Sequence, residues 1–168
     1  DGLNWWALRE PATHLSFTIS SHVVPTQFEP INRPQSQEGL WIGDVMDNLG
    51  YSDESYFQQV YSLLNDVRDA DGTDWAVAVF IAHSFWDLDG SFPDGFSAYA
   101  YQGGPFIVMT YDNGGWGVSN MDGVFAHELG HTFYALDEYW DAQEEPDMRA
   151  GYLNVDIQNT EYGGTFDL

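Results

Sequence analysis

The chain has 168 residues, the length of one ordinary domain, and its 43% hydrophobic and 17% aromatic content favours a packed core over disorder. A formal net charge of −23, from 27 Asp and Glu against 4 Lys and Arg, argues against binding to nucleic acid or to an anionic membrane surface. The absence of cysteine excludes disulfides, thiol catalysis and cysteine-ligated metals, and no apolar run approaches the roughly 20 residues of a membrane span.

The first half of the chain predicts one strand and two helices. Residues Leu15 to Ser20 alternate apolar and polar side chains, which is typical of a strand, and three prolines within residues 21–38 indicate a loop. Apolar residues fall at helical spacing from Leu40 to Leu49 and again from Tyr56 to Val67. Residues 1–11 show no clear period, so no element is predicted there.

The second half predicts three strands before its main helix. Trp75 to Ala82 is a nearly continuous apolar run, which suits a buried strand. Ser97 to Tyr101 and Phe106 to Tyr111 are two further strands, and Gly103-Gly104 between them indicates a hairpin.

A third helix follows, and Ser119 with Asp122 fits a capping box at its start. Its apolar stripe consists of Met121, Val124, Phe125, Leu129, Phe133 and Leu136. The order of elements predicts a mixed α/β domain of the α+β kind, in which residues 1–168 form one unit with helices packed on a twisted sheet. Mostly loop is expected after residue 140.

The stretch HELGH at residues 127–131 lies on this helix and has the pattern H-E-x-x-H. Residues i and i+4 share one helix face, so His127 and His131 can reach one zinc ion at about 2.0–2.1 Å each. Glu128 lies about 100° around the helix from His127, beside the metal without needing to bind it. A carboxylate in that position can take a proton from a water that the metal activates. The pattern therefore predicts two zinc ligands and a catalytic base.

Two histidines and a water leave one protein ligand to be found. The candidates are Asp137, Glu138, Asp141 and a distant residue. An unbroken helix would place Glu138 about 10 Å along the axis from His131, too far to share the metal. The helix is therefore expected to stop near Tyr134 and turn back, which makes Asp137 the natural third ligand and Glu138 the second choice.

The motif resembles the metzincin peptidases, whose pattern is HExxHxxGxxH with a third ligand at the end. Asp137 occupies the last position, as Asp does in the immune-inhibitor-A-like peptidases, and the following Asp-Glu-Tyr is similar to the IgA-peptidase-like bacterial family. The resemblance covers roughly residues 106–139. It implies a zincin fold, a polypeptide substrate, and a cleft edged by the strand Phe106 to Tyr111, for which a plain core strand is the equal alternative.

The sequence departs from the metzincin pattern in two places. Tyr134 replaces the glycine that lets the chain turn, and since bulky residues disfavour a positive φ, the turn is expected to be made differently. Met148 is the one methionine after the motif and lies in a polar stretch, so we expect the chain to stop before the methionine turn. A separate or cleaved C-terminal segment would then supply that turn.

Calcium is a second candidate metal, because Asp87, Asp89 and Asp94 lie in a glycine-containing loop. The spacing of these aspartates does not match an EF-hand, so it favours the alternative, an ordinary solvated turn. The remaining histidines, His14, His22 and His83, are expected to be ordinary surface or packed residues.

Together these features predict a zinc-dependent endopeptidase in which Glu128 is the general base. The chain begins with Asp rather than Met, which fits a processed form that has lost a secretory signal, and a secreted protein is expected. Two alternatives remain open: a zinc hydrolase of a non-peptide amide or ester, and a glycan-binding or adhesion module with a structural metal.

Overall fold

A computed structural model describes residues 1–9, 12, 14–52, 55–138, 142, 144–145 and 148–157. Within these ranges the α-helices are α1 (Gly2–Arg9), α2 (Glu38–Asn48), α3 (Tyr56–Asp71) and α4 (Met121–Thr132). The strands are β1 (Ala78–Ala82), β2 (Ala98–Ala100), β3 (Phe106–Thr110), β4 (Arg149–Ala150) and β5 (Val155–Asp156). The mixed α/β class is as predicted from the sequence.

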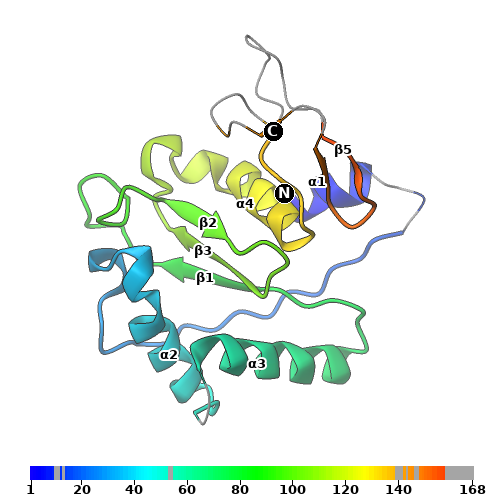
Figure 1. The fold of residues 1–168 in the computed structure, drawn as a ribbon. Helices are drawn as coiled ribbons and strands as arrows, with labels where there is room; N and C mark the ends of the chain where they lie inside the picture. The colour runs from blue at the N-terminus through cyan, green and yellow to red at the C-terminus, as the bar shows by residue number, and fades with distance from the viewer. Residues whose placement is uncertain are drawn as a thin grey trace.

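The main sheet has the order β1-β3-β2, with β3 parallel to β1 and antiparallel to β2. α4 and α1 lie on one face of this sheet, and α2 and α3 lie on the other (Figure 1). β3 is buried along its whole length, because it is the central strand and has helices on both sides.

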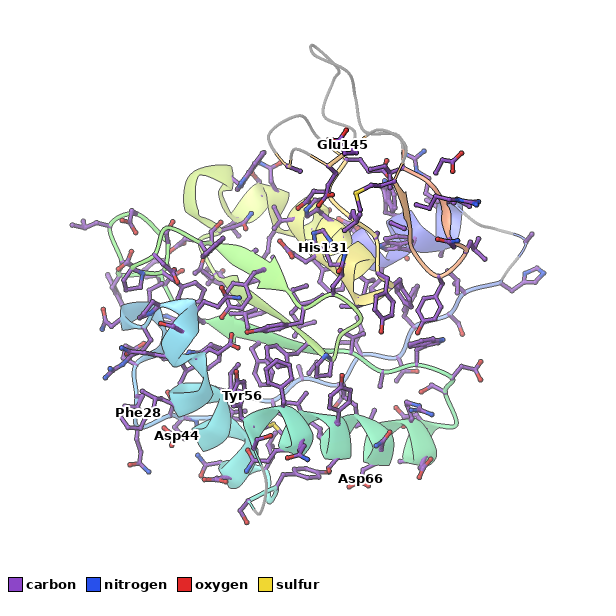
Figure 2. All side chains as sticks on the ribbon, in the orientation of Figure 1. Phe28, Asp44, Tyr56, Asp66, His131 and Glu145 are labelled. Atoms are coloured by element: carbon purple, nitrogen blue, oxygen red, sulfur yellow. The ribbon has the colours of Figure 1, made fainter. Side chains whose placement is uncertain are left out.

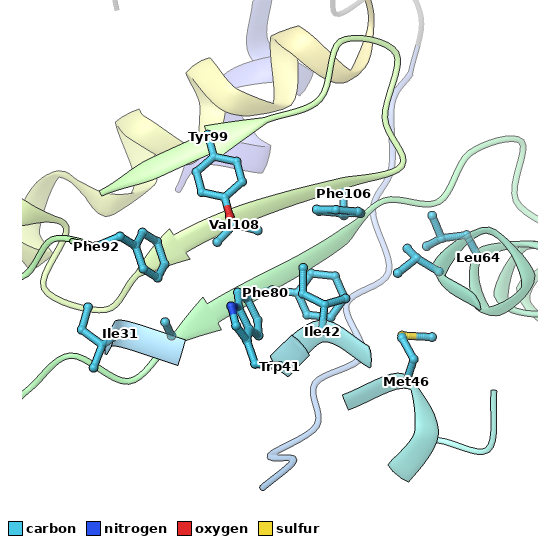
Figure 3. Close-up of a cluster of buried hydrophobic side chains, with 12 residues drawn as sticks. Ile31, Trp41, Ile42, Met46, Leu64, Phe80, Phe92, Tyr99, Phe106 and Val108 are labelled. Atoms are coloured by element: carbon cyan, nitrogen blue, oxygen red, sulfur yellow. The ribbon is translucent and has the colours of Figure 1, made fainter. Parts of the chain in front are cut away.

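The alternation of β3 divides the core into two clusters. Phe106 and Val108 face α2 and α3 and pack in a cluster that includes Trp41, Ile42 and Phe80 (Figure 3). Ile107 and Met109 face the other way and pack with Val124 and Leu129 of α4. Alternate residues of β3 thus point toward α4 and pack that helix against the sheet.

Two short segments differ from the sequence predictions. Leu15 to Ser20 is exposed and forms no strand, so that prediction is wrong. Residues 2–9, for which no element was predicted, form α1, which packs on α4 through a hydrogen bond from Trp6 Nε1 to the Ala126 carbonyl (3.1 Å). The β4–β5 hairpin was likewise not predicted.

The predicted helices and hairpin are otherwise confirmed, with small shifts at their ends. The capping box is an exception: α4 begins at Met121 after Asn120, and no side chain caps it. Among the residues that the structure describes, no helix is both long enough and apolar enough to cross a membrane.

A buried carboxyl group ties α2 to α3 and β2. Glu38 is 1% exposed and accepts hydrogen bonds from the hydroxyls of Tyr56 (3.0 Å), Tyr99 (2.5 Å) and Tyr101. Burial, followed by the charge of Glu38, raises the pKa of Tyr56 to about 12. These contacts satisfy both carboxyl oxygens inside the core.

Replacing Glu38 with Ala is expected to lower the free energy of unfolding by at least about 3 kcal/mol, because three hydroxyls lose a shared acceptor. Glu29→Ala is the matched control, since Glu29 is exposed and its side chain forms no cap bond. It should change stability by less than about 0.5 kcal/mol. Urea unfolding of both variants measures this, and equal stabilities would show that the Glu38 cluster contributes little.

Candidate metal centre

α4 holds two histidines one turn apart, outside its packed face. Val124 and Leu129 of this helix are buried in the core, whereas the side chains of His127 and His131 are 28% and 16% exposed. The two Nε2 atoms lie 3.2 Å apart. Figure 2 shows His131 projecting from α4 near the middle of the molecule. The helix therefore presents both rings to the same small space.

The helix ends in a Schellman motif directly after His131. The Ala135 amide donates to the Gly130 carbonyl (3.2 Å) and the Tyr134 amide donates to the His131 carbonyl (2.9 Å), which is the pair of bonds that defines this motif. Tyr134 sits at the left-handed position with φ 64°. The expectation that a bulky residue would force a different turn is therefore wrong: Tyr134 adopts the conformation itself, at a cost of about 1–2 kcal/mol.

The turn brings Asp137 back to the two histidines. Asp137 Oδ1 lies 3.0 Å from His127 Nε2 and 3.4 Å from His131 Nε2. This oxygen is buried, yet among the described residues it accepts no hydrogen bond of good geometry. The three potential ligand atoms thus lie close together around one point.

The spacing of these three atoms fits one tetrahedral ion. Bonds of about 2.0–2.1 Å at tetrahedral angles separate ligand atoms by about 3.3–3.4 Å, close to the 3.0–3.4 Å observed. Two imidazoles and a carboxylate are also the donors that zinc prefers. Of the parts of the chain that are described, no other group of three His, Asp or Glu residues is gathered closely enough to hold a metal.

Hydrogen bonding sets the tautomer of His131. Its Nδ1 lies 2.8 Å from the Ala135 carbonyl, and since a carbonyl only accepts, Nδ1 carries the proton. In the neutral ring Nε2 then presents its lone pair to Asp137 and His127, as a metal ligand must. Asp137 raises the pKa of His131 to about 9, and the two histidines hold the pKa of Asp137 well below its usual range. Asp137 thus favours the protonated form of His131, and a cation would compete with that proton for the ring nitrogen.

Glu128 lies beside this group without belonging to it. Its side chain is buried, with 7% of the residue exposed, between α4 and β2. Burial raises its pKa, whereas His127 and His131, and a hydrogen bond from the Ala100 amide, lower it. A carboxyl group with a raised pKa beside a metal centre suits proton transfer near neutral pH.

A cavity of about 210 Å³ opens beside the three ligands. It is lined by Ala100, Gln102, His131, Leu136, Asp137 and Glu144. Sequence reasoning singled out neither Gln102 nor Glu144. Gln102 follows the predicted strand of the hairpin and could have been placed near the helix from that position, whereas no signal in the sequence marks Glu144.

Several other predicted site residues are not brought together with the histidines. Glu138 is exposed and lies outside the three-residue group, and Asp141 falls outside the described residues. His14, His22 and His83 are all exposed and also lie outside this group. Met148 is 39% exposed, so it is not buried beneath the three ligands.

The role predicted for Phe106 to Tyr111 is wrong. This segment is the central strand β3, whose neighbours on both sides occupy its backbone groups, so it does not edge a cleft. β1 and β2 are the two edge strands of this sheet, and the Ala100 amide of β2 lies near Glu128. The edge strand beside the site is therefore β2.

The aspartates considered for calcium serve other contacts. Asp87 Oδ1 and Asp89 Oδ1 accept backbone amides within their own loop, from Gly90 and Ser91 at 3.0 Å each. Asp94 Oδ2 accepts the Gln35 amide (2.6 Å) from another part of the chain. These carboxylates do not converge on one point in the described structure.

Comparisons with known proteins do not extend this picture. No family model matches the chain, and searches of curated proteins and of solved structures find no match either. The interpretation of the site therefore depends on its own geometry.

Proposed function

We propose that this chain is a zinc-dependent endopeptidase of the metzincin kind, with His127, His131 and Asp137 as the zinc ligands. The observation that supports this most directly is the convergence of three ligand atoms within 3.4 Å, beside a buried carboxyl group that is not a ligand. Three protein ligands leave a position open for water or substrate, as in catalytic rather than structural zinc sites.

A zinc ion held by His127, His131 and Asp137 would supply Lewis acidity, lowering the pKa of a water molecule and stabilising negative charge on a peptide carbonyl oxygen. Glu128 would act as the base, because its carboxylate can take a proton from the attacking water and pass it to the leaving amine. The nearby Ala100 amide favours the charged form of that carboxylate. His131 is held in the required tautomer by the Ala135 carbonyl.

A polypeptide substrate fits the surroundings of the site. β2 is an edge strand of the main sheet, and an edge strand can pair with an extended peptide through backbone hydrogen bonds. The cavity beside His131 and Asp137 has room for a substrate side chain. The proposal includes secretion, which the sequence alone suggests.

Metal analysis combined with a cleavage assay tests this proposal. We expect one zinc per chain, and we expect a reduced, unstructured protein to be cleaved at internal sites. Removing the metal with a chelator should lower cleavage at least 1,000-fold, on the order of what metal and base together contribute, and added zinc should restore it.

Two outcomes would contradict the proposal. A chain that binds no zinc lacks the proposed centre altogether. A chain that binds one zinc but cleaves no unstructured protein has another activity, and a panel of simple amides and esters would then identify a hydrolase of non-peptide substrates. His127→Ala is the negative control, because the loss of a zinc ligand should abolish both zinc binding and peptide cleavage.

A further inference from the structure

The turn after His131 combines an unfavourable backbone conformation with two contacts to the metal centre. Tyr134 has φ 64°, a conformation that glycine usually provides at this position of a Schellman motif. The carbonyl of the next residue, Ala135, accepts the hydrogen bond from His131 Nδ1, and Asp137 follows two residues later. Any shift of Tyr134 would move both groups.

One glycine in the β2–β3 connection makes room for the Tyr134 ring. A Cβ atom on Gly103 would lie 2.4 Å from Tyr134 Cζ and 2.6 Å from its Oη, closer than atoms can approach. The Gly103 amide also donates to the His131 carbonyl (2.9 Å), so the connection lies directly on the end of α4. The hydroxyl end of the Tyr134 ring therefore packs against Gly103.

A segment near the C-terminus also contacts Tyr134. The Tyr134 carbonyl accepts the Gly151 amide (2.9 Å), and the rings of Tyr134 and Tyr152 meet edge to face with centroids 5.6 Å apart. Two distant segments of the chain thus contact one strained residue. Residues in rarely populated conformations persist where the surrounding structure holds them in this way.

We propose that Tyr134 is a positioning residue for the metal centre, and that Gly103, which has no side chain, leaves the space that the Tyr134 ring occupies. The packing of the ring on Gly103 holds the left-handed turn, and the turn sets the positions of the Ala135 carbonyl and of Asp137. This inference rests on the proposed zinc site, because its effect is on metal affinity. It also explains how this chain dispenses with a glycine at position 134.

Gly104 provides a matched control for a substitution at Gly103. Both glycines have a positive φ, 83° and 86°, but a Cβ on Gly104 would meet nothing within 4 Å. Gly103→Ala should weaken zinc binding roughly 10–100-fold, the usual effect of losing a group that orients a ligand, whereas Gly104→Ala should change it less than about threefold. Zinc affinity measured by competition with a chelating dye gives both values.

A second pair of variants shows whether the effect acts through the ring. Tyr134→Phe keeps the ring and should bind zinc like the parent chain, whereas Tyr134→Ala should bind it about tenfold more weakly. Adding Gly103→Ala to Tyr134→Ala should then weaken zinc binding little further, because the tyrosine ring that the new Cβ would meet is absent. Equal affinities for the Gly103 and Gly104 variants, or a full additional loss in the Tyr134→Ala background, would overturn the proposal.

A measurement on the metal-free chain separates this inference from the proposed function. The Nδ1 proton of His131, bonded to the Ala135 carbonyl, has a characteristic NMR shift, which Gly103→Ala should change and Gly104→Ala should preserve. If the parent chain binds no zinc, the proposed function fails, and this signal still tests the positioning role. If zinc binds but the signal and the affinity are the same in both variants, only the positioning role fails.

Discussion

Replacing Glu128 with Gln is expected to lower kcat/KM for peptide cleavage by about 100- to 10,000-fold while leaving one zinc bound per chain. The amide cannot accept the proton from the attacking water, and general acid–base catalysis contributes a factor of this size. Zinc should remain, because Glu128 lies outside the group of three converging ligands. A fluorogenic peptide and metal analysis on the same preparation measure the two quantities. Loss of zinc, or cleavage at the parent rate, would contradict the assigned role.

The stability of the same variant shows whether it has folded. Burial raises the pKa of Glu128, so the folded metal-free chain holds its proton more tightly than the unfolded chain does. The contribution of Glu128 to stability therefore falls as pH rises from its pKa in the unfolded chain to its higher pKa in the folded chain. Glu128→Gln carries no such charge, so at neutral pH it should be at least as stable as the parent chain without metal. Asp122→Asn is the matched control on α4, since Asp122 is exposed in the first turn, and it should leave cleavage unchanged.

The sequence was most informative where a periodic pattern and a local turn signal coincided. The stripes from Leu40 and from Tyr56 gave α2 and α3, and Gly103-Gly104 marked the hairpin between β2 and β3. Each of these signals operates over a few residues, so no knowledge of distant contacts was needed. The spacing of HELGH is also local, and it placed His127 and His131 on one helix face with their Nε2 atoms 3.2 Å apart.

The predictions failed where distant contacts decide the structure. Leu15 to Ser20 has the alternation of a strand but pairs with no other strand in the described chain, and pairing is what makes a strand. α1 has little periodicity, and its contact with α4 runs through Trp6 to a carbonyl 120 residues away. Neither outcome is encoded in the segment itself.

The turn at Tyr134 combines both kinds of information. The need for the helix to stop there followed from the 1.5 Å rise per residue and the reach of Asp137. The preference of bulky residues for negative φ gave the wrong expectation, because the compensating space is provided by Gly103, a residue on another element. A local propensity of about 1–2 kcal/mol is small enough for such packing to reverse it.

Replacing Asp137 with Ala is expected to weaken zinc binding by more than about 100-fold, whereas Glu138→Ala should leave it unchanged. Loss of a residue that merely orients a ligand costs roughly 10–100-fold, and loss of the ligand itself should exceed that. The two carboxylates are adjacent in sequence, but Asp137 Oδ1 lies within 3.4 Å of both histidine nitrogens and Glu138 is exposed.

Because the two variants remove the same charge from neighbouring positions, general electrostatic effects of a chain with net charge −23 cancel between them. Any difference in zinc affinity then reports direct ligation, and cleavage should fall in parallel with it. Equal losses in both variants would mean that the carboxylates act only through their charge, and a loss confined to Glu138→Ala would mean that the turn after Tyr134 presents the other side chain in solution. A selective loss in Asp137→Ala would establish that a left-handed tyrosine, rather than a glycine, can deliver the third ligand to an H-E-x-x-H helix.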